Sequence, residues 1–370
     1  MRVLILYVSV GTGHMKAAEA LKESIERQFT GWSVDILDTL KYINPIVDKI
    51  VVSSYLGALK RSPGLYSRLY TASGRGTGIY DISKALNKLL SFKLNSLIND
   101  YGPSAIVCTH PFPMQMLSSL KEKNKIKIPT VAILTDYVVH SLWLDSGMDA
   151  FIVANDSMKS EMMQRGIPGN IIFPYGIPVS PKFLTRVDKK KLKRELGLED
   201  KFTVLVMGGG MGFGNIDNTM ASLLDCDIDI QIIAVTGTNQ KLKTQLELSA
   251  GNSNKKVLVL SYTDKINELM DISDLLITKP GGMTISEALV KGLPIFIISP
   301  IPGQEEGNAN FLIRSGAANK IEDSGQLISV LSQVANDPVT LNIMRENSKF
   351  LGKPHSAADI ATLLGKLVLG

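Results

Sequence analysis

The stretch from Lys279 to Asn308 decides the fold. It opens with Lys279-Pro280-Gly281-Gly282-Met283-Thr284-Ile285-Ser286-Glu287-Ala288 and closes with Pro302-Gly303-Gln304-Glu305-Glu306-Gly307-Asn308. The apolar run 275–278 precedes it, and a helical pattern follows the glycines. A buried strand, a glycine turn and a helix start direct free backbone N–H groups and the helix dipole at one point. The stretch therefore predicts an α/β unit whose turn binds a diphosphate, with polar groups nearby for a ribose and a sugar.

Individual residues of the turn and its helix have candidate roles in holding this donor. Gly281 and Gly282 permit a close approach of phosphate to the backbone, and Thr284 offers a hydroxyl. Glu287 can accept two ribose hydroxyls, or it can form an exposed helix contact with Lys291 one turn later. The remaining candidates, for the sugar and for the rest of the donor, are Lys279, Met283, Gln304, Glu305 and Asn308.

A second glycine-rich loop follows the predicted strand 203–207. Five of the seven residues from 208 to 214 are glycines. Consecutive N–H groups in such a loop can cradle an anion, although a flexible loop would have the same composition. The candidate donor-binding residues here are Gly208, Gly209, Gly210, Gly212 and Phe213.

Length and composition limit the class of protein. The chain has 370 residues, 45% of them hydrophobic and 20% charged, with a net charge of +5. These values predict two globular domains and exclude an obviously basic nucleic-acid binder. Cys108 and Cys226 have neither disulfide nor zinc spacing, so buried reduced thiols are expected. We find no signal peptide and no apolar run of the roughly 18 residues that cross a bilayer.

Alternating apolar runs and amphipathic segments predict two α/β halves. In the first half, strands are expected at 3–8, 32–37, 105–109, 130–135 and 150–154, and helices at 16–28 and 157–165. In the second half, strands are expected at 203–207, 230–235, 257–260, 275–278 and 295–298. Prolines and glycines punctuate 174–202. We predict two doubly wound, Rossmann-like domains facing across a cleft, 1–178 and 179–355, with a last helix at 356–370 that packs back on the first.

The first half carries histidines and a carboxylate at its strand ends. Gly11-Thr12-Gly13-His14 follows the first strand, and His14 is either a helix-cap residue or a residue that faces the ligand. Asp136 follows the strand 130–135, where it can act as a cap or take a proton from an acceptor hydroxyl. Candidate acceptor-side residues are Gly13, His110, His140 and Trp143, of which Trp143 would also suit a core.

The segment 41–75 is basic and rich in tyrosine. It carries Lys60, Arg61 and Arg68 among six basic residues, and Tyr55 among its aromatic residues. Basic residues mixed with aromatic and aliphatic ones are typical of an element that lies on an anionic membrane surface. An ordinary amphipathic helix packed on the first domain would show the same pattern.

These motifs resemble those of the monogalactosyldiacylglycerol synthases and the bacterial processive diacylglycerol glucosyltransferases, which are related to the peptidoglycan lipid-linked GlcNAc transferase. The N-terminal resemblance lies in Gly11–His14, Thr109-His110-Pro111 and Thr135-Asp136 with His140 and Trp143. The C-terminal resemblance lies in 279–288 and 302–308, which is the donor signature of the wider group. The resemblance as a whole spans nearly the full chain.

The resemblance implies a GT-B fold, a UDP-sugar donor, inversion at the anomeric carbon, no essential metal or cofactor, and peripheral attachment to the cytoplasmic face of the membrane. It implies that Glu287 holds the ribose and that Gly281, Gly282 and Thr284 hold the diphosphate. It leaves His14 and Asp136 as alternative bases.

The predicted function is transfer of a hexose from a UDP-sugar to diacylglycerol or a glycosyl-diacylglycerol. One alternative is transfer to another lipid-linked acceptor, such as an undecaprenyl-diphosphate sugar. A second alternative is a UDP-GlcNAc 2-epimerase, which has the same two-domain fold and needs no membrane.

Overall fold

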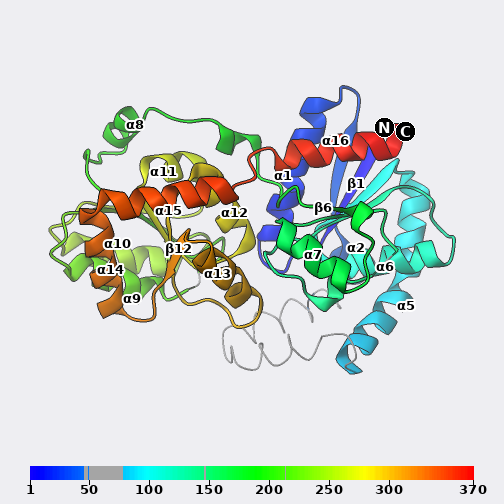
Figure 1. Cartoon of the computed structure of the whole chain (residues 1–370), viewed down its shortest axis with the longest axis horizontal. Coiled ribbons are helices and arrows are strands. Elements are labelled where there is room, and N and C mark those ends of the chain that lie inside the picture. The colour runs from blue at the N-terminus through cyan, green and yellow to red at the C-terminus, as the bar shows by residue number, and fades with distance from the viewer. Residues whose placement is uncertain (46–48, 50–77, 146, 213) are drawn as a thin grey trace. The chain divides into compact units, whose positions relative to one another are not determined.

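The computed structural model describes residues 1–45, 49, 78–145, 147–212 and 214–370. The chain forms two compact units (Figure 1). The first unit comprises Met1–Pro181, Ile301–Gln304 and His355–Gly370, and the second comprises Lys182–Pro300 and Glu305–Pro354.

The first unit is built on one parallel sheet with the strand order β2-β1-β3-β4-β5-β6. The strands are β1 (Arg2–Tyr7), β2 (Ser33–Asp38), β3 (Ala105–Cys108), β4 (Thr130–Ile133), β5 (Ala150–Ile152) and β6 (Ile172–Phe173). The strands β3, β4 and β5 are buried along their whole length. This burial explains their continuous apolar sequences, because helices cover both faces of such a sheet.

The helices of the first unit are α1 (Gly13–Gln28), α2 (Thr39–Ile43), α5 (Gly78–Tyr101), α6 (Pro111–Glu122), α7 (Asp156–Gln164) and α16 (Ser356–Leu369), with 3-10 turns η1 (Ser141–Trp143) and η2 (Gly169–Ile171). A third 3-10 turn, η3 (Pro181–Leu184), begins at the last residue of the stretch Met1–Pro181 and continues into the second unit. The last helix, α16, packs against α1 (Figure 1). Ile360 and Leu364 of α16 are buried in the core of this unit. Gln28 donates a hydrogen bond of 2.8 Å to Thr362. The end of the chain therefore completes the first unit.

The second unit has a parallel sheet with the strand order β12-β11-β10-β7-β8-β9. The strands are β7 (Thr203–Met207), β8 (Gln231–Val235), β9 (Val257–Leu260), β10 (Leu275–Thr278), β11 (Ile295–Ile297) and β12 (Ala318–Lys320). The helices are α8 (Lys189–Glu195), α9 (Ile216–Asp225), α10 (Gln240–Gly251), α11 (Ile266–Ile272), α12 (Gly282–Lys291), α13 (Gln304–Arg314), α14 (Ser324–Asn336) and α15 (Pro338–Leu351).

Two short strands were not predicted. β6 has two residues and β12 has three, and β12 reads Ala-Asn-Lys. So short a strand carries no measurable alternation of apolar and polar residues, and its pairing with a neighbour decides its conformation. The helix α1 begins at Gly13, three residues before the predicted start, so His14 lies in its first turn.

Both sheets have a point where the strand order reverses. In the second sheet β7 lies beside β10, and the chain runs outward from this pair in both directions. In the first sheet β1 lies beside β3 in the same way. Ligands of open parallel sheets bind beyond the carboxyl ends of the strands at such points. Among the described helices, none is both long and apolar enough to cross a membrane.

Candidate functional site

The reversal point of the second sheet brings the two predicted donor loops together. Met207, the last residue of β7, pairs with Thr278, the last residue of β10. The hydroxyl of Thr278 donates a 2.9 Å hydrogen bond to the carbonyl of Met207. Gly208 and Lys279 therefore begin neighbouring loops at the same edge of the sheet.

Lys279 lies at the centre of these loops. Its ammonium group forms an ion pair with Glu305 of α13, and the two side chains are 20% and 10% exposed. A Cβ added to Gly209 would meet the Lys279 side chain at 3.4 Å, and one added to Gly214 would meet it at 3.6 Å. The loop after β7, the loop after β10 and the start of α13 are therefore in contact around one ion pair.

The first turn of α12 has free backbone donors. No described side chain caps this helix, and the first N–H that bonds within it is that of Ile285, which donates to Gly281 at 3.0 Å. The N–H groups of Gly282, Met283 and Thr284 remain for an anion. A Cβ on Gly281 would meet nothing nearer than Glu305, at 4.0 Å, so the approach to this turn is open.

Asn308 supports this turn from α13. It is fully buried and donates a 3.0 Å hydrogen bond from Nδ2 to the carbonyl of Pro280. The structure therefore gives Asn308 a part in shaping the loop. Met283 is 8% exposed, whereas Thr284 and Glu287 of the same helix are partly exposed.

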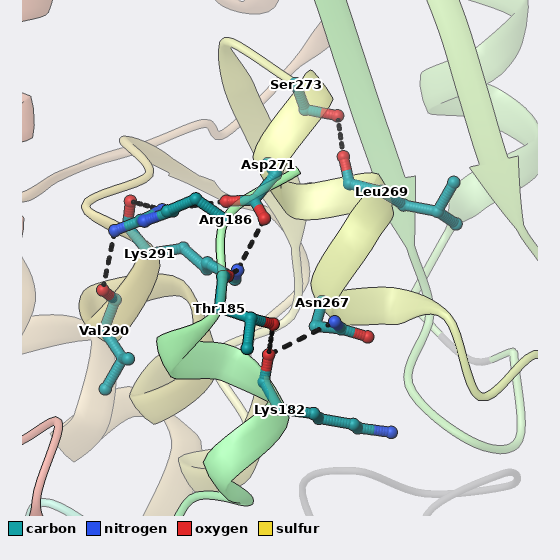
Figure 2. Close-up of polar contacts among 9 residues, drawn as sticks. All are labelled: Lys182, Thr185, Arg186, Asn267, Leu269, Asp271, Ser273, Val290 and Lys291. Carbon is teal, nitrogen blue, oxygen red and sulfur yellow. Dashed lines mark hydrogen bonds and ion pairs between the residues drawn. The ribbon is translucent and has the colours of Figure 1, made fainter. Parts of the chain in front are cut away.

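The far end of α12 is held by a buried ion cluster (Figure 2). Lys291 and Asp271 have side chains that are 0% and 1% exposed, and Lys291 Nζ lies 2.7 Å from Asp271 Oδ2. Lys291 also donates to the carbonyl of Thr185 at 2.6 Å. Burial lowers the pKa of Lys291, and the hydrogen bond to Asp271 opposes that shift. The exposed helix contact that we considered for Glu287 is therefore wrong, because Lys291 lies inside the protein.

Arg186 completes the cluster and caps α12 (Figure 2). One guanidinium nitrogen donates to Asp271 Oδ1 at 2.8 Å and to the carbonyl of Lys291 at 3.1 Å, and another donates to the carbonyl of Val290 at 3.3 Å. Two cations at a helix C-terminus complement the negative end of its dipole. The cluster therefore fixes α12 at the end opposite the candidate diphosphate site.

His14 lies at the reversal point of the first sheet. Its Nδ1 is 2.5 Å from the carbonyl oxygen of Thr109, which follows β3, and 3.1 Å from the hydroxyl of Thr135. The Thr109 hydroxyl in turn donates to the His14 carbonyl at 3.0 Å. A carbonyl oxygen can only accept, so Nδ1 carries the proton of the neutral imidazole and Nε2 is left with a lone pair.

The surroundings of His14 keep it neutral. Burial lowers its pKa from 6.5 to about 4, and the hydrogen bond to Thr109 opposes this only in part. The ring of His110 lies edge-on to that of His14, with the centroids 4.6 Å apart. Burial and the neighbouring His14 also lower the pKa of His110 well below its usual value.

The other candidate residues of the first unit have mainly structural contacts. His110 caps α6, because its Nδ1 accepts from the N–H of Phe112 at 3.2 Å. His140 caps η1 in the same way through Leu142, at 3.3 Å. Trp143 is 4% exposed, which matches the core alternative considered from the sequence. Gly13 is the first residue of α1, and no described side chain caps this N-terminal end of the helix.

Asp136 is buried in the loop between β4 and η1, three residues after the strand ends. It is 8% exposed, and its Oδ2 accepts a hydrogen bond from the side-chain amide of Gln304, which belongs to the same compact unit. It follows Thr135, the neighbour of His14, in the chain. Asp136 is therefore a second polar group, next in the chain to a residue that contacts His14.

Five sequence candidates lie outside the described residues, namely Tyr55, Lys60, Arg61, Arg68 and Phe213. Within the described part of the chain, no group of three or more His, Cys, Asp or Glu side chains is arranged to hold a metal ion.

Several residues that shape the site were missed from the sequence. Thr109 and Thr135, which stood in the N-terminal motifs without an assigned role, orient His14, and Asp271 and Arg186, which stood in no motif, anchor α12. Thr109 and Thr135 lie 95 and 121 positions from His14, and Arg186 lies 85 positions from Asp271. The only sequence signal was the position of both threonines at the ends of predicted strands.

Comparison with protein families gives two matches. Residues 14–179 match the family model described as monogalactosyldiacylglycerol (MGDG) synthase. Residues 203–364 match the glycosyltransferase family 28 C-terminal domain. The first match includes β3 and His14, and the second includes β7 and β10.

Curated relatives match over nearly the whole chain. Proteins named processive diacylglycerol beta-glucosyltransferase from Bacillus pumilus and Bacillus subtilis are each 30% identical over 369 residues, and one from Bacillus licheniformis is 31% identical over 371. Each alignment covers 97% of this chain and 93% of the relative.

Solved structures share the fold at low sequence identity. MurG of Acinetobacter baumannii superposes with a TM-score of 0.64 at 16% identity, covering 99% of both chains. A UDP-GlcNAc 2-epimerase of Neisseria meningitidis superposes with a TM-score of 0.64 at 15% identity, covering 99% of this chain and all of that one. The predicted GT-B fold class is confirmed.

Proposed function

Because this chain belongs to the glycosyltransferase family of the processive diacylglycerol beta-glucosyltransferases, we propose that it transfers a hexose from a UDP-sugar to the hydroxyl of diacylglycerol or of a glycosyl-diacylglycerol. The product is a glycolipid. The single observation that carries the assignment is the full-length similarity to these enzymes, and the geometry of the two reversal points gives it a chemical basis.

The second unit holds the donor. The free N–H groups at the start of α12 and those of the glycine loop after β7 bind the diphosphate of the UDP-sugar, because exposed backbone N–H groups favour phosphate anions. Lys279 adds a positive charge beside both loops, because its side chain lies along Gly209 and Gly214. The resemblance assigns the ribose to Glu287 and the sugar to Gln304, Glu305 and Asn308, of which Glu305 and Asn308 belong to this unit.

The first unit supplies the base, and we assign this role to His14. Its Nδ1 is committed to Thr109, so Nε2 is the atom that can take a proton from the acceptor hydroxyl. The lowered pKa keeps the ring unprotonated near neutral pH, which is the form that a general base needs. Asp136 is the alternative, but its Oδ2 already accepts from Gln304.

The reaction is a single displacement. The acceptor oxygen attacks the anomeric carbon from the face opposite UDP, which inverts its configuration, and the diphosphate leaves with the bonding electrons. The N–H groups at the start of α12 stabilise the charge that develops on the leaving group. This arrangement requires no metal, and we propose that the enzyme works without one.

Diacylglycerol resides in a bilayer, so the first unit must meet a membrane surface. We propose that the basic segment 41–75 makes this contact on the cytoplasmic face, where anionic lipids attract Lys and Arg. Tyr42, which belongs to this segment, is 47% exposed, and Phe92, 17 residues beyond its end, is 64% exposed. Liposome flotation of the wild type and of a K60A/R61A/R68A variant tests the proposal, and unchanged binding of the variant would contradict it.

The reaction itself is tested by incubating the protein with UDP-glucose, UDP-galactose or UDP-GlcNAc and liposomes that contain diacylglycerol. Mass spectrometry of the lipids should show one or more added hexoses. Transfer only to an undecaprenyl-diphosphate sugar, or conversion of UDP-GlcNAc without any lipid product, would replace the proposal with one of its two alternatives.

A further inference from the structure

The glycine loop after β7 is held by the loop that follows β8. The carbonyl of Gly210 accepts from the N–H of Thr238 at 3.0 Å and from the Thr238 hydroxyl at 3.3 Å. A Cβ added to Gly237 would collide with the carbonyl oxygen of Gly210 and would lie 2.7 Å from that of Gly209. The two loops therefore pack backbone against backbone, and the glycine loop is not the unconstrained loop considered from its composition.

This packing determines which way the neighbouring N–H groups point. All peptide bonds of the described chain are trans, and a trans peptide directs its carbonyl and its N–H to opposite sides. Because the carbonyls of Gly209 and Gly210 face the loop 236–238, the N–H groups of Gly210 and Met211 point away from it. Among the described residues, neither N–H has a hydrogen-bond acceptor.

The other side of the glycine loop faces the donor site. Lys279 lies beside Gly209 and Gly214, on the side of β10. Two successive unpaired N–H groups beside an ammonium group form a concavity suited to an anion. Gly209 and Gly212 both have a φ of +65°, which gives the loop the left-handed residues that such a concavity needs.

We propose that Gly237 and Thr238 are positioning residues for the donor diphosphate. They orient the Gly209 and Gly210 peptides so that the N–H groups of Gly210 and Met211 face the phosphate oxygens. This inference rests on the proposed function, since it concerns the same donor. Gly237 has to be glycine, both because its φ is +60° and because its neighbour leaves no room for a methyl group.

A matched pair of substitutions isolates the contact from the backbone strain. Gly237→Ala and Gly197→Ala place alanine at similar φ values, +60° and +67°, but an added Cβ at Gly197 meets no atom within 4 Å. Isothermal titration calorimetry with UDP and with uridine, together with thermal unfolding, compares the two variants. We expect Gly237→Ala to weaken UDP binding by about tenfold or more, with uridine affinity retained and Gly197→Ala binding UDP as the wild type does.

Thr238 provides a second, milder test. Thr238→Val removes the hydroxyl bond to Gly210 and keeps the backbone bond, whereas Thr238→Ser keeps both. We expect the valine variant to weaken UDP binding by a few-fold and the serine variant to match the wild type. If Gly237→Ala bound UDP as Gly197→Ala does, or lost UDP and uridine affinity equally, the inference would be overturned. Failure of the wild type to bind UDP at all would instead overturn the proposed function.

Discussion

The two reversal points occupy the same place in their sheets but are built from different chemistry. In the second unit the site consists of backbone N–H groups, glycines and the ion pair of Lys279 with Glu305. In the first unit it consists of imidazole rings whose pKa values burial has lowered. A doubly wound sheet therefore offers a geometric position, and the residues at the strand ends determine its chemistry. We propose that one position binds an anion and that the other moves a proton.

The largest expected effect tests the proton-moving site. The substitution His14→Asn keeps a side-chain N–H near the Nδ1 position, where it can donate to Thr109, but removes the lone pair of Nε2. We expect kcat to fall by about 10²–10⁴-fold, the usual contribution of a general base. Steady-state transfer assays measure it. A variant with wild-type kcat, or an Asp136→Asn variant that loses more activity, would move the base to Asp136.

The next effect tests how much the ion cluster at the C-terminal end of α12 contributes to stability. Asp271→Asn removes the carboxylate that pairs with both Lys291 and Arg186, and it leaves the buried ammonium group of Lys291 without an anionic partner among the described residues. We expect the free energy of unfolding to fall by about 3–5 kcal/mol, measured by urea denaturation.

Arg345→Gln is the matched control for this change. It breaks another arginine–aspartate pair of the second unit, with Asp274, whose side chains are 29% and 24% exposed. Such a pair contributes about 0–1 kcal/mol. Equal losses in the two variants would show that the buried cluster has no special part in stability.

Gly281→Ala tests whether the turn before α12 is open to the diphosphate of the donor. The residue has a φ of −72° and no protein atom closer than 4.0 Å to an added Cβ, so an alanine fits the fold. We expect stability to change by no more than about 1 kcal/mol. The methyl group would stand where the diphosphate approaches, and UDP affinity should fall about tenfold or more. Calorimetric titration measures this, and unchanged affinity would place the diphosphate elsewhere.

The smallest effect concerns pH. The pKa of His14 is about 4 in the folded chain against 6.5 when exposed, so the unfolded chain binds the extra proton first as pH falls. The stability linked to His14 is complete above pH 6.5 and is lost as the pH falls toward 4. The wild type should therefore lose more stability than His14→Asn between pH 8 and 5, by urea denaturation. Parallel losses would contradict the lowered pKa.

The strands and the order of the elements could be predicted because a parallel sheet buries both faces. Continuous apolar runs marked β7 and β10 with the bounds that the structure has, and the predicted last helix, 356–370, matches α16 to within one residue. The glycine turns were visible because few other residues permit such turns. The sequence pattern did not predict β6 and β12, which have only two and three residues.

The contacts that orient the site were not predictable in the same way. Lys279 and Glu305 are 26 residues apart, and both had been assigned to the donor without any indication that they pair. Gly237 is a single glycine in the sequence Thr-Gly-Thr, and only the fold shows that it faces the carbonyls of the glycine loop. Pairing between strands, which no local pattern specifies, creates both contacts.

The central claim is that the second unit binds the donor and the first unit supplies the base. The most direct test measures UDP affinity and transfer rate in parallel for His14→Asn and Gly281→Ala. We predict that His14→Asn binds UDP as the wild type does and transfers almost no sugar, whereas Gly281→Ala binds UDP weakly and recovers transfer at high donor concentration. Loss of UDP affinity in His14→Asn, with wild-type affinity in Gly281→Ala, would contradict the account.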